Sequence, residues 1–365
     1  MIILSSLILI LVVGVLIFIR QDKFGELPKG ERLSHIKTSV NYQDEQFQNI
    51  EHTPDLTEGT TIFSVLKDVI FPPNDRLRPL DPIPSVKTDI ENIGTDENIL
   101  IWFGHSSYYL QLDGKKILVD PVFSGTSSPV PNNIKAFQGS DQYSAKDFSG
   151  IDYLFITHDH WDHLDYKTVL QLKDEVETVI CGLGVGQHLE SWGYNKNKII
   201  EKDWNKQITL DKGFIVNTVS ARHFSGRGFK RNKSLWLSFV LQSPTIKIFI
   251  GGDSGYGKHF AGIGDEFGPF DLAILENGQY DEKWRYIHMM PEEVLQAALD
   301  LKAKQLFPVH SGKFKLANHA WDEPLKRISL ANEEIKLQLM TPIIGEKIDL
   351  NDSSRTFTQW WEHVK

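Results

Sequence analysis

The feature that most constrains this chain is a six-residue polar run placed directly after an apolar segment. The run is His158-Asp159-His160-Trp161-Asp162-His163, and it follows Tyr153-Leu154-Phe155-Ile156-Thr157. The apolar segment predicts a buried strand, so the run occupies the loop at its tip. Imidazole and carboxylate are ligands that divalent ions such as Zn²⁺ prefer. The pattern therefore predicts a metal site with ligands enough for two ions, in preference to a solvated loop.

Three later residues repeat this local arrangement. His223, Asp253 and His310 each follow shortly after an apolar, strand-like segment, at 214–219, 247–250 and 306–309. A histidine of this kind standing alone is more often structural. Beside the 158–163 run, the shared position after a strand favours a ligand, because strand ends place loop residues on a rigid base.

Charge and cysteine content narrow the function classes. The formal net charge of −9 argues against a nucleic-acid partner, since such binding relies on basic side chains that displace counterions. Cys181 is the single cysteine, so a disulfide within the chain is impossible and any metal must be held by histidine and carboxylate.

The N-terminus predicts a transmembrane helix. Residues 2–19 carry no charge, and 18 helical residues would span about 27 Å, close to the roughly 30 Å hydrocarbon core. The alternative, a cleaved signal peptide, requires basic residues before the apolar run and a small-x-small site after it, and neither is present. We therefore expect a single-pass membrane anchor at 1–20. Arg20 and Lys23 follow the segment and favour a cytoplasmic position for the rest of the chain.

The remaining chain divides into three parts. Residues 21–96 are rich in charge, proline and asparagine, which predicts an extension that wraps over a neighbouring domain or links to it. Residues 97–350 are expected to form the domain that carries the metal site. Residues 351–365 are expected to form a C-terminal tail. In the domain, early strands pair by hairpins and later strands alternate with helices, an order that two face-to-face sheets with helices outside would accommodate. Glycines 182, 184 and 186 match no nucleotide-binding motif and predict a turn into a helix at 187–192.

Several short motifs carry a family resemblance. They include Trp102-Phe103-Gly104-His105-Ser106, Val119-Asp120-Pro121, the run 156–165, Gly251-Gly252-Asp253-Ser254-Gly255-Tyr256, Gly278-Gln279-Tyr280, His288-Met289-Met290-Pro291-Glu292-Glu293 and Pro308-Val309-His310-Ser311-Gly312. With these motifs the chain resembles the metallo-β-lactamase superfamily, over residues ~97–345. Within it the chain looks most similar to the N-acyl-phosphatidylethanolamine phospholipase D branch and its bacterial relatives. The resemblance implies an α/β fold, the αβ/βα sandwich, with metals at one edge of the sheets.

The resemblance also implies a dinuclear centre, with Zn²⁺ as the expected ion. One metal would be held by His158, His160 and His223, and the other by Asp162, His163 and His310. Asp253 would bridge the two, with a water between them. Asp120, Asp165 and His105 are expected to support the ligands from behind.

Four residues are candidates for work on the substrate. Asp162 would orient the attacking water, and His288 matches a histidine that lies near the phosphate in the related phospholipases. Tyr280 and His288 are predicted to contact the substrate. Arg231 joins them because five basic residues between 222 and 233 favour an anionic group.

The leading hypothesis is a membrane-anchored, dinuclear metal-dependent hydrolase: a phospholipase D-like phosphodiesterase acting on a membrane lipid or another anionic phosphodiester. One departure concerns the substrate: the chain has Glu276-Asn277-Gly278-Gln279-Tyr280 where the phospholipase branch has Pro-Ile-Gly-Ala-Tyr. A lactonase of the same superfamily is the alternative enzyme, and an anchored metal-binding module without catalysis is the alternative of another class. Diiron oxidoreductase relatives have glutamate where this chain has His160, which favours hydrolysis here.

Overall fold

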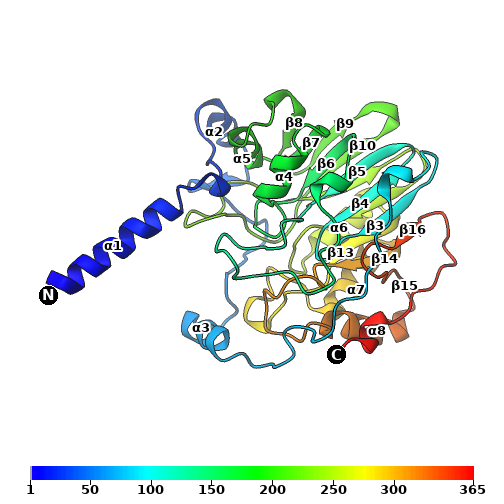
Figure 1. Cartoon of the computed structure of the whole chain (residues 1–365). Coiled ribbons are helices and arrows are strands. Elements are labelled where there is room, and N and C mark those ends of the chain that lie inside the picture. Colours follow the sequence, from blue (N-terminus) through cyan, green and yellow to red (C-terminus); the bar gives the residue numbers. More distant parts are fainter. Residues whose placement is uncertain (1) are drawn as a thin grey trace.

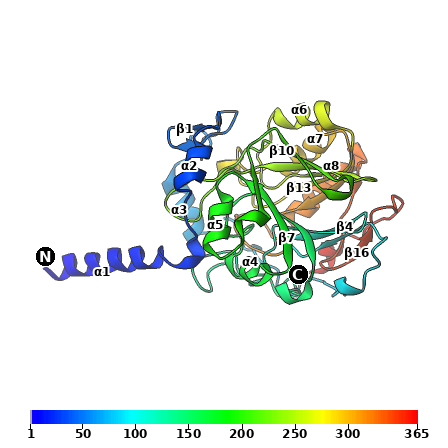
Figure 2. The same cartoon turned by 90° about the horizontal axis from the view of Figure 1, so that it is seen from above.

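Two seven-stranded sheets lie face to face, and helices cover the outer face of each (Figures 1 and 2). This computed structural model describes residues 2–365, and Met1 lies outside the described part. The strand order of the first sheet is β16 (Lys347–Asp349), β3 (Ile99–Trp102), β4 (Tyr108–Leu112), β5 (Lys115–Val119), β6 (Ile151–Ile156), β7 (Val176–Gly182) and β8 (Ile199–Lys202). That of the second is β15 (Gln338–Leu339), β14 (Ala303–Val309), β13 (Phe270–Glu276), β12 (Lys247–Ile250), β11 (Ser238–Gln242), β10 (Ile215–Val219) and β9 (Lys206–Thr209).

Each sheet changes from antiparallel to parallel pairing, as the sequence order predicts. In the first sheet β3, β4 and β5 pair antiparallel, and β5 to β8 pair parallel. The β4–β5 hairpin turns at Asp113 and Gly114, whose φ values of 47° and 76° are those of a tight primed turn. In the second sheet β9 to β12 are antiparallel and β12 to β15 are parallel.

Strand β6 shows why so many strands are apolar along their whole length. Tyr153 and Phe155 face the core between the sheets, where the Phe155 ring lies 4.9 Å from the ring of Phe239 in β11. Leu154 and Ile156 face the other way, into the layer formed with the outer helices. Because both faces are covered, the alternation of polar and apolar residues is lost.

Helices form the outer layers. On the first sheet these are α4 (Tyr166–Leu172) and α5 (Val185–Ser191), and on the second α6 (His259–Phe267), α7 (Pro291–Asp300) and α8 (Glu323–Ile335). Gly184, with φ of 95°, makes the turn into α5 that the glycine-rich segment predicts. Short 3-10 helices lie at Asp22–Phe24, Ile90–Asn92, Ala145–Asp147, Lys196–Lys198, Asp211–Gly213, Glu282–Trp284 and Trp360–His363. The predicted sandwich with outer helices is confirmed.

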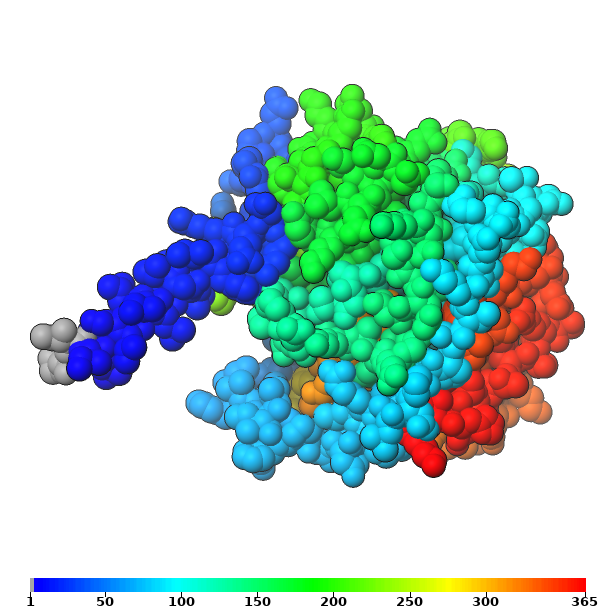
Figure 3. Space-filling model, in the orientation of Figure 1, coloured from blue at the N-terminus to red at the C-terminus, as the bar shows by residue number. Residues whose placement is uncertain are grey.

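The apolar N-terminus forms α1 (Ile2–Phe18), a helix of 17 residues that projects from the body (Figures 1 and 3). Within residues 2–365 no helix combines the length and apolar character needed to cross a bilayer. The predicted anchor at 1–20 and the single-pass membrane localisation are therefore wrong, and the inference of a cytoplasmic body loses its basis. The helix ends early because the chain turns at residues 19–20, after which Phe24 packs on Trp161 with ring centroids 5.1 Å apart.

The extension lies along the sandwich and carries α2 (Gly30–Ile36), β1 (Tyr42–Gln43), β2 (Gln46–Phe47) and α3 (Ile62–Ile70). In α2, Arg32 donates to Glu201 Oε2 at 2.6 Å and to Glu190 Oε2 at 2.9 Å. At the other end of the chain, Trp360 and Trp361 are buried in the core between the sheets. Both chain ends therefore add apolar or ionic contacts to the domain.

We predict that Arg32→Ala lowers the free energy of unfolding by about 2 kcal/mol, because it leaves two partly buried carboxylates without their cation. Glu201 is the more sensitive of the two, since its other oxygen already accepts the N–H groups of Gly184 and Gly186. Urea unfolding measures the change. The control is Lys29→Ala, which removes an exposed ion pair with Glu26 and should cost under about 0.5 kcal/mol. Equal effects of the two variants would contradict an ionic attachment of the extension.

Candidate metal centre

The candidate ligands lie at one edge of the sandwich, where strand ends from both sheets meet. His158 follows β6 of the first sheet, whereas His223, Asp253 and His310 follow β10, β12 and β14 of the second. All four side chains are buried. The folded strands thus bring together residues up to 152 positions apart in the sequence, from His158 to His310.

One group of ligands surrounds His160. The ligand atoms of His158, His160, His223 and Asp253 all lie within 4.8 Å of one another. Nδ1 of His160 is 3.0 Å from Nε2 of His158 and 3.2 Å from Nε2 of His223. Three imidazole nitrogens at this separation can share one cation.

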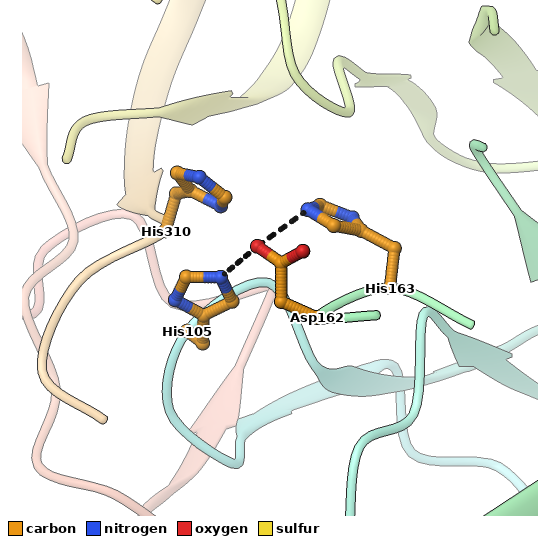
Figure 4. Close-up of side chains that lie close together, drawn as sticks. All are labelled: His105, Asp162, His163 and His310. Atoms are coloured by element: carbon orange, nitrogen blue, oxygen red, sulfur yellow. Dashed lines mark hydrogen bonds and ion pairs between the residues drawn. The ribbon is translucent and has the colours of Figure 1, made fainter. Parts of the chain in front are cut away.

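A second group adjoins the first and is drawn in Figure 4. It contains His105, Asp162, His163 and His310, again with ligand atoms within 4.8 Å of one another. Oδ2 of Asp162 lies 2.8 Å from Nε2 of His105 and 3.6 Å from Nε2 of His163. His105 therefore holds the Asp162 carboxylate, which agrees with the supporting position predicted for it.

Asp253 lies between the two groups. Its Oδ1 is 3.2 Å from Nε2 of His163 and 3.2 Å from Nδ1 of His310. Its Oδ2 is 3.7 Å from Nε2 of both His158 and His223. One oxygen faces each group, which is the geometry that a bridging carboxylate requires.

The buried polar atoms of this cluster fit a pair of divalent ions. Nε2 of His163 and Oδ1 of Asp253 are buried and have no hydrogen-bond partner in the described chain. Leaving such an atom unpaired costs about 1–3 kcal/mol. Cations at the centre of the two groups would satisfy these lone pairs, and a nitrogen and oxygen donor set without sulfur suits Zn²⁺ and neighbouring divalent ions.

Burial keeps most of the imidazoles in the neutral form that binds metals. It lowers the pKa of His158, His223 and His310 well below the usual value and that of His160 to about 4. Burial acts in the same direction on His163, but the carboxylates of Asp253, Asp162 and Asp120 outweigh it and raise the pKa of His163 well above the usual value. A bound cation would replace the proton that these carboxylates attract.

Asp120 fixes the orientation of His163. Oδ2 of Asp120 accepts from Nδ1 of His163 at 2.8 Å and from Oγ1 of Thr157 at 2.6 Å. This directs Nε2 of His163 toward the centre, as expected for a residue that supports a ligand. Asp165, expected in a similar position, instead accepts from the N–H of Lys167 as the N-cap of α4 and from Oγ1 of Thr168. The reason is that the chain enters a helix immediately after it.

A cavity of about 460 Å³ opens beside the cluster. Of the predicted substrate residues, Arg231 and His288 line it together with the catalytic candidate Asp162. Tyr280 does not: it is buried, donates to Glu323 Oε1 at 3.1 Å and stacks on His319. The loop after β13 turns this ring toward α8, and Gln279 takes the place beside the cavity.

The basic loop 222–233 is mostly engaged within the protein. Arg222 donates to the backbone oxygens of His52 and Tyr256. Arg227 is buried, with its guanidinium 3.9 Å from the Trp161 ring centroid and bonded to the backbone oxygens of Asp159 and Leu164. Arg231 is the one basic residue of this loop that lines the cavity. Of the five basic residues expected to favour an anionic substrate, Arg231 is therefore the one that this loop places at the cavity.

The extension supplies residues that sequence reasoning missed. Asn49 donates from Nδ2 to the backbone oxygen of His223 at 2.7 Å and accepts from its N–H at 3.1 Å. Asp55, Leu56 and Ile62 line the cavity. The 174 positions that separate Asn49 from His223 leave no local signal.

Comparison with known proteins places this site in a family. Residues 115–311, just over half of the chain, match the model of a Beta-lactamase superfamily domain. The chain belongs to the metallo-β-lactamase superfamily. It is a metal-dependent hydrolase of that superfamily, which confirms the resemblance found in the sequence.

Individual relatives agree with this assignment. An uncharacterised protein of Mycobacterium bovis is 37% identical over 329 residues, covering 88% of this chain and 87% of the relative. N-acyl-phosphatidylethanolamine-hydrolyzing phospholipase D 1 of Caenorhabditis elegans is 25% identical over 274 residues, covering 69% and 75%. A metallo hydrolase from Ignicoccus hospitalis has a similar fold, with a TM-score of 0.53 and 20% identity over 69% of this chain and 97% of its own.

We predict that chelation destabilises the protein, because the imidazoles and carboxylates of the centre lose the cations that satisfy them. A metal at about 1,000 times its dissociation constant stabilises the folded state by about 4 kcal/mol, so Tm should fall by several degrees and recover when Zn²⁺ is restored. Differential scanning calorimetry before and after dialysis against a chelator measures this. The double variant His160→Ala/Asp253→Ala serves as control and should respond far less. An unchanged Tm with no metal bound would argue against the centre.

We also predict that Asn49→Ala weakens metal binding about 10–100-fold, because the backbone of ligand His223 loses both hydrogen bonds that fix it. Competition with a metal-sensitive chelating dye measures the affinity. Asn41→Ala is the matched control. Asn41 lies in the same extension, and its Nδ2 donates a hydrogen bond to Asp203, away from the metal ligands. If both variants bind metal as the unsubstituted protein does, the extension has no part in holding the ligand.

Proposed function

We propose that the protein is a zinc-dependent phosphodiesterase whose substrate carries an apolar, lipid-like group next to the phosphate. The observation that carries this proposal is the cavity beside the ligand cluster. It combines one guanidinium, one imidazole outside the proposed ligand set (His288) and an apolar wall within a single opening of about 460 Å³.

The polar part of the cavity suits a phosphate. Arg231 reaches it with its guanidinium 4.0 Å from the ring centroid of Phe224, and bonds Asp55 at 2.7 and 3.0 Å. The Arg231 side chain is 38% exposed, so an anionic substrate can compete with Asp55 for it. His288 lines the same cavity, with its ring 5.3 Å from that of His310. A planar guanidinium binds two phosphate oxygens at once, which favours this group over a neutral carbonyl.

The rest of the cavity is apolar. Its wall is formed by Leu56, Ile62, Phe224, Trp284, Ile287 and Leu316. Cavities of this size and lining bury most of a ligand of several tens of atoms. Aliphatic and aromatic side chains at the mouth of the site favour an acyl chain or a similar group over a sugar or a nucleotide. The name of the Caenorhabditis elegans relative, a phospholipase D that hydrolyses an N-acyl phospholipid, supports the same substrate class.

The residues divide the chemical work as follows. Two Zn²⁺ ions held by the two ligand groups would activate a water molecule and neutralise charge on the phosphate. Asp162, held by His105, accepts a hydrogen bond from that water and so fixes its direction of approach. Arg231 binds a non-bridging phosphate oxygen, and His288 contacts the phosphate from the side of His223 and His310. Phe224 and Trp284 exclude bulk water, which strengthens each of these electrostatic contacts.

We predict that the zinc-loaded full chain hydrolyses bis-p-nitrophenyl phosphate and an N-acyl-phosphatidylethanolamine in mixed micelles. His160→Ala should lower kcat by about 10²–10⁴-fold, because it removes the ligand at the centre of the first group. Chromogenic release and lipid mass spectrometry measure the two reactions. His363→Ala, at the exposed C-terminal end, is the matched histidine control.

Other results would redirect the proposal. Hydrolysis of lactones without any phosphodiester turnover would contradict it and favour attack on a carbonyl carbon. Two bound metals without turnover of any ester would favour the metal-binding module.

A further inference from the structure

Glu276 is a carboxylate buried next to the ligand cluster without a lysine or arginine partner. It is the last residue of β13, and its side chain is fully buried. Across the described chain its one ion-pair contact is with His288. Its carboxylate also lies near Asp253, since both belong to a group whose ligand atoms are within 4.8 Å of one another. Two buried carboxylates side by side are costly unless each has a specific partner.

The partners of Glu276 are divided between its two oxygens. Oε1 accepts the backbone N–H of Met289 at 2.9 Å and that of Ser254 at 3.3 Å. Oε2 lies 2.5 Å from Nδ1 of His288. Because two backbone groups hold Oε1, the carboxylate cannot rotate, and Oε2 remains directed at the histidine.

The His288 ring is held on several sides. It stacks on His310 with an interplanar angle of 20° and meets the His223 ring edge at 64°. Its Nδ1 edge faces the buried carboxylate, while the side chain is 12% exposed and lines the cavity. No other hydrogen bond of this ring is found in the described residues, so Nε2 is the nitrogen left for the substrate.

We propose that Glu276 is a positioning residue, which holds the imidazole of His288 with Nδ1–H directed into the protein and Nε2 directed at the substrate. The proposal rests on the phosphodiesterase function and adds a residue to its site. Burial raises the pKa of the Glu276 carboxyl group well above its usual value, and divalent cations in the ligand cluster would oppose this shift. As a carboxylate, Glu276 accepts hydrogen bonds only, so Nδ1 of His288 then carries the proton and Nε2 faces the substrate without one. The proline found at this position in the Pro-Ile-Gly-Ala-Tyr pattern has no side chain that can do this.

The variant Glu276→Gln distinguishes the effect of residue 276 on the proton position in His288 from its effect on packing. Its oxygen can keep the two backbone N–H groups, and its NH₂ group then faces Nδ1 of His288. A donor at that place makes Nδ1 an acceptor and moves the proton to Nε2. The variant is nearly isosteric, and it changes which nitrogen of His288 carries the proton.

We predict that Glu276→Gln lowers kcat for bis-p-nitrophenyl phosphate by about 10–100-fold and changes KM by less than about 3-fold. The reason is that Nε2 then carries a proton and no longer accepts one, while Arg231 and the apolar wall still bind the substrate. In a double-variant cycle, Glu276→Gln should cost almost nothing further once His288→Ala is present. Asp271→Asn, the same change at the opposite end of β13, is the control and should leave kcat within about 2-fold. Equal losses with and without His288 would overturn the proposal.

A measurement independent of turnover separates this proposal from the assigned reaction. In zinc-loaded protein with ¹⁵N-labelled histidine, the NMR signals of His288 should show a proton on Nδ1, and in Glu276→Gln a proton on Nε2. A neutral His288 without a proton on Nδ1 in the unsubstituted protein would overturn the proposal, whether or not the variant folds. If phosphodiesters are not cleaved but the NMR result holds, the function fails and the positioning of His288 stands.

Discussion

The candidate metal centre depends on packing between the two sheets, which brings imidazoles and carboxylates into one buried cluster. The groups of this cluster do not form enough hydrogen bonds among themselves to satisfy every polar atom. Nε2 of His163 and Oδ1 of Asp253 are buried and form no hydrogen bond across residues 2–365, at the meeting point of both sheets. Apolar packing between the sheets, such as that of Phe155 on Phe239, brings these strand ends together. Burial of apolar side chains thus compensates for the unfavourable burial of these polar groups. Divalent cations bound to them would lower that cost, so metal binding would add to the stability of the fold.

A second layer of hydrogen bonds gives each ligand its direction. Asp120 orients His163, His105 orients Asp162, and Asn49 fixes the backbone of His223. These three residues come from the loops after β5 and β3 and from the N-terminal extension. The extension is therefore part of the site although it carries no metal ligand. Its residues Leu56 and Ile62 also form part of the apolar cavity wall, so a segment outside the superfamily match at 115–311 contributes to the cavity.

The sequence predicts most of the sheet strands and all of the residues in the cluster, and its failures have physical causes. Strands buried on both faces, such as β6, are apolar runs that a sequence reveals directly. Helix α8 carries charged and polar residues along most of its length and buries few side chains, so the sequence shows no clear apolar face that would predict it. The prediction of a membrane anchor at 1–20 was wrong because α1 ends at Phe18 and the chain turns at residues 19–20. Asn49 and Tyr280 depend on contacts 174 and 43 positions away, which periodicity cannot report.

The positions where this chain departs from the phospholipase pattern lie beside the metals and not among them. Metal ligands are constrained by the coordination of the ions, so they tolerate little variation. The residues behind them can change while the metals stay in place. Glu276 is such a change: it places a buried carboxyl group near Asp253, with Oε2 2.5 Å from Nδ1 of His288. Since a buried carboxyl group is costly, the proposed positioning of His288 gives a reason for Glu276 at this place: the group would set the orientation of the imidazole and leave the metal ligands unchanged.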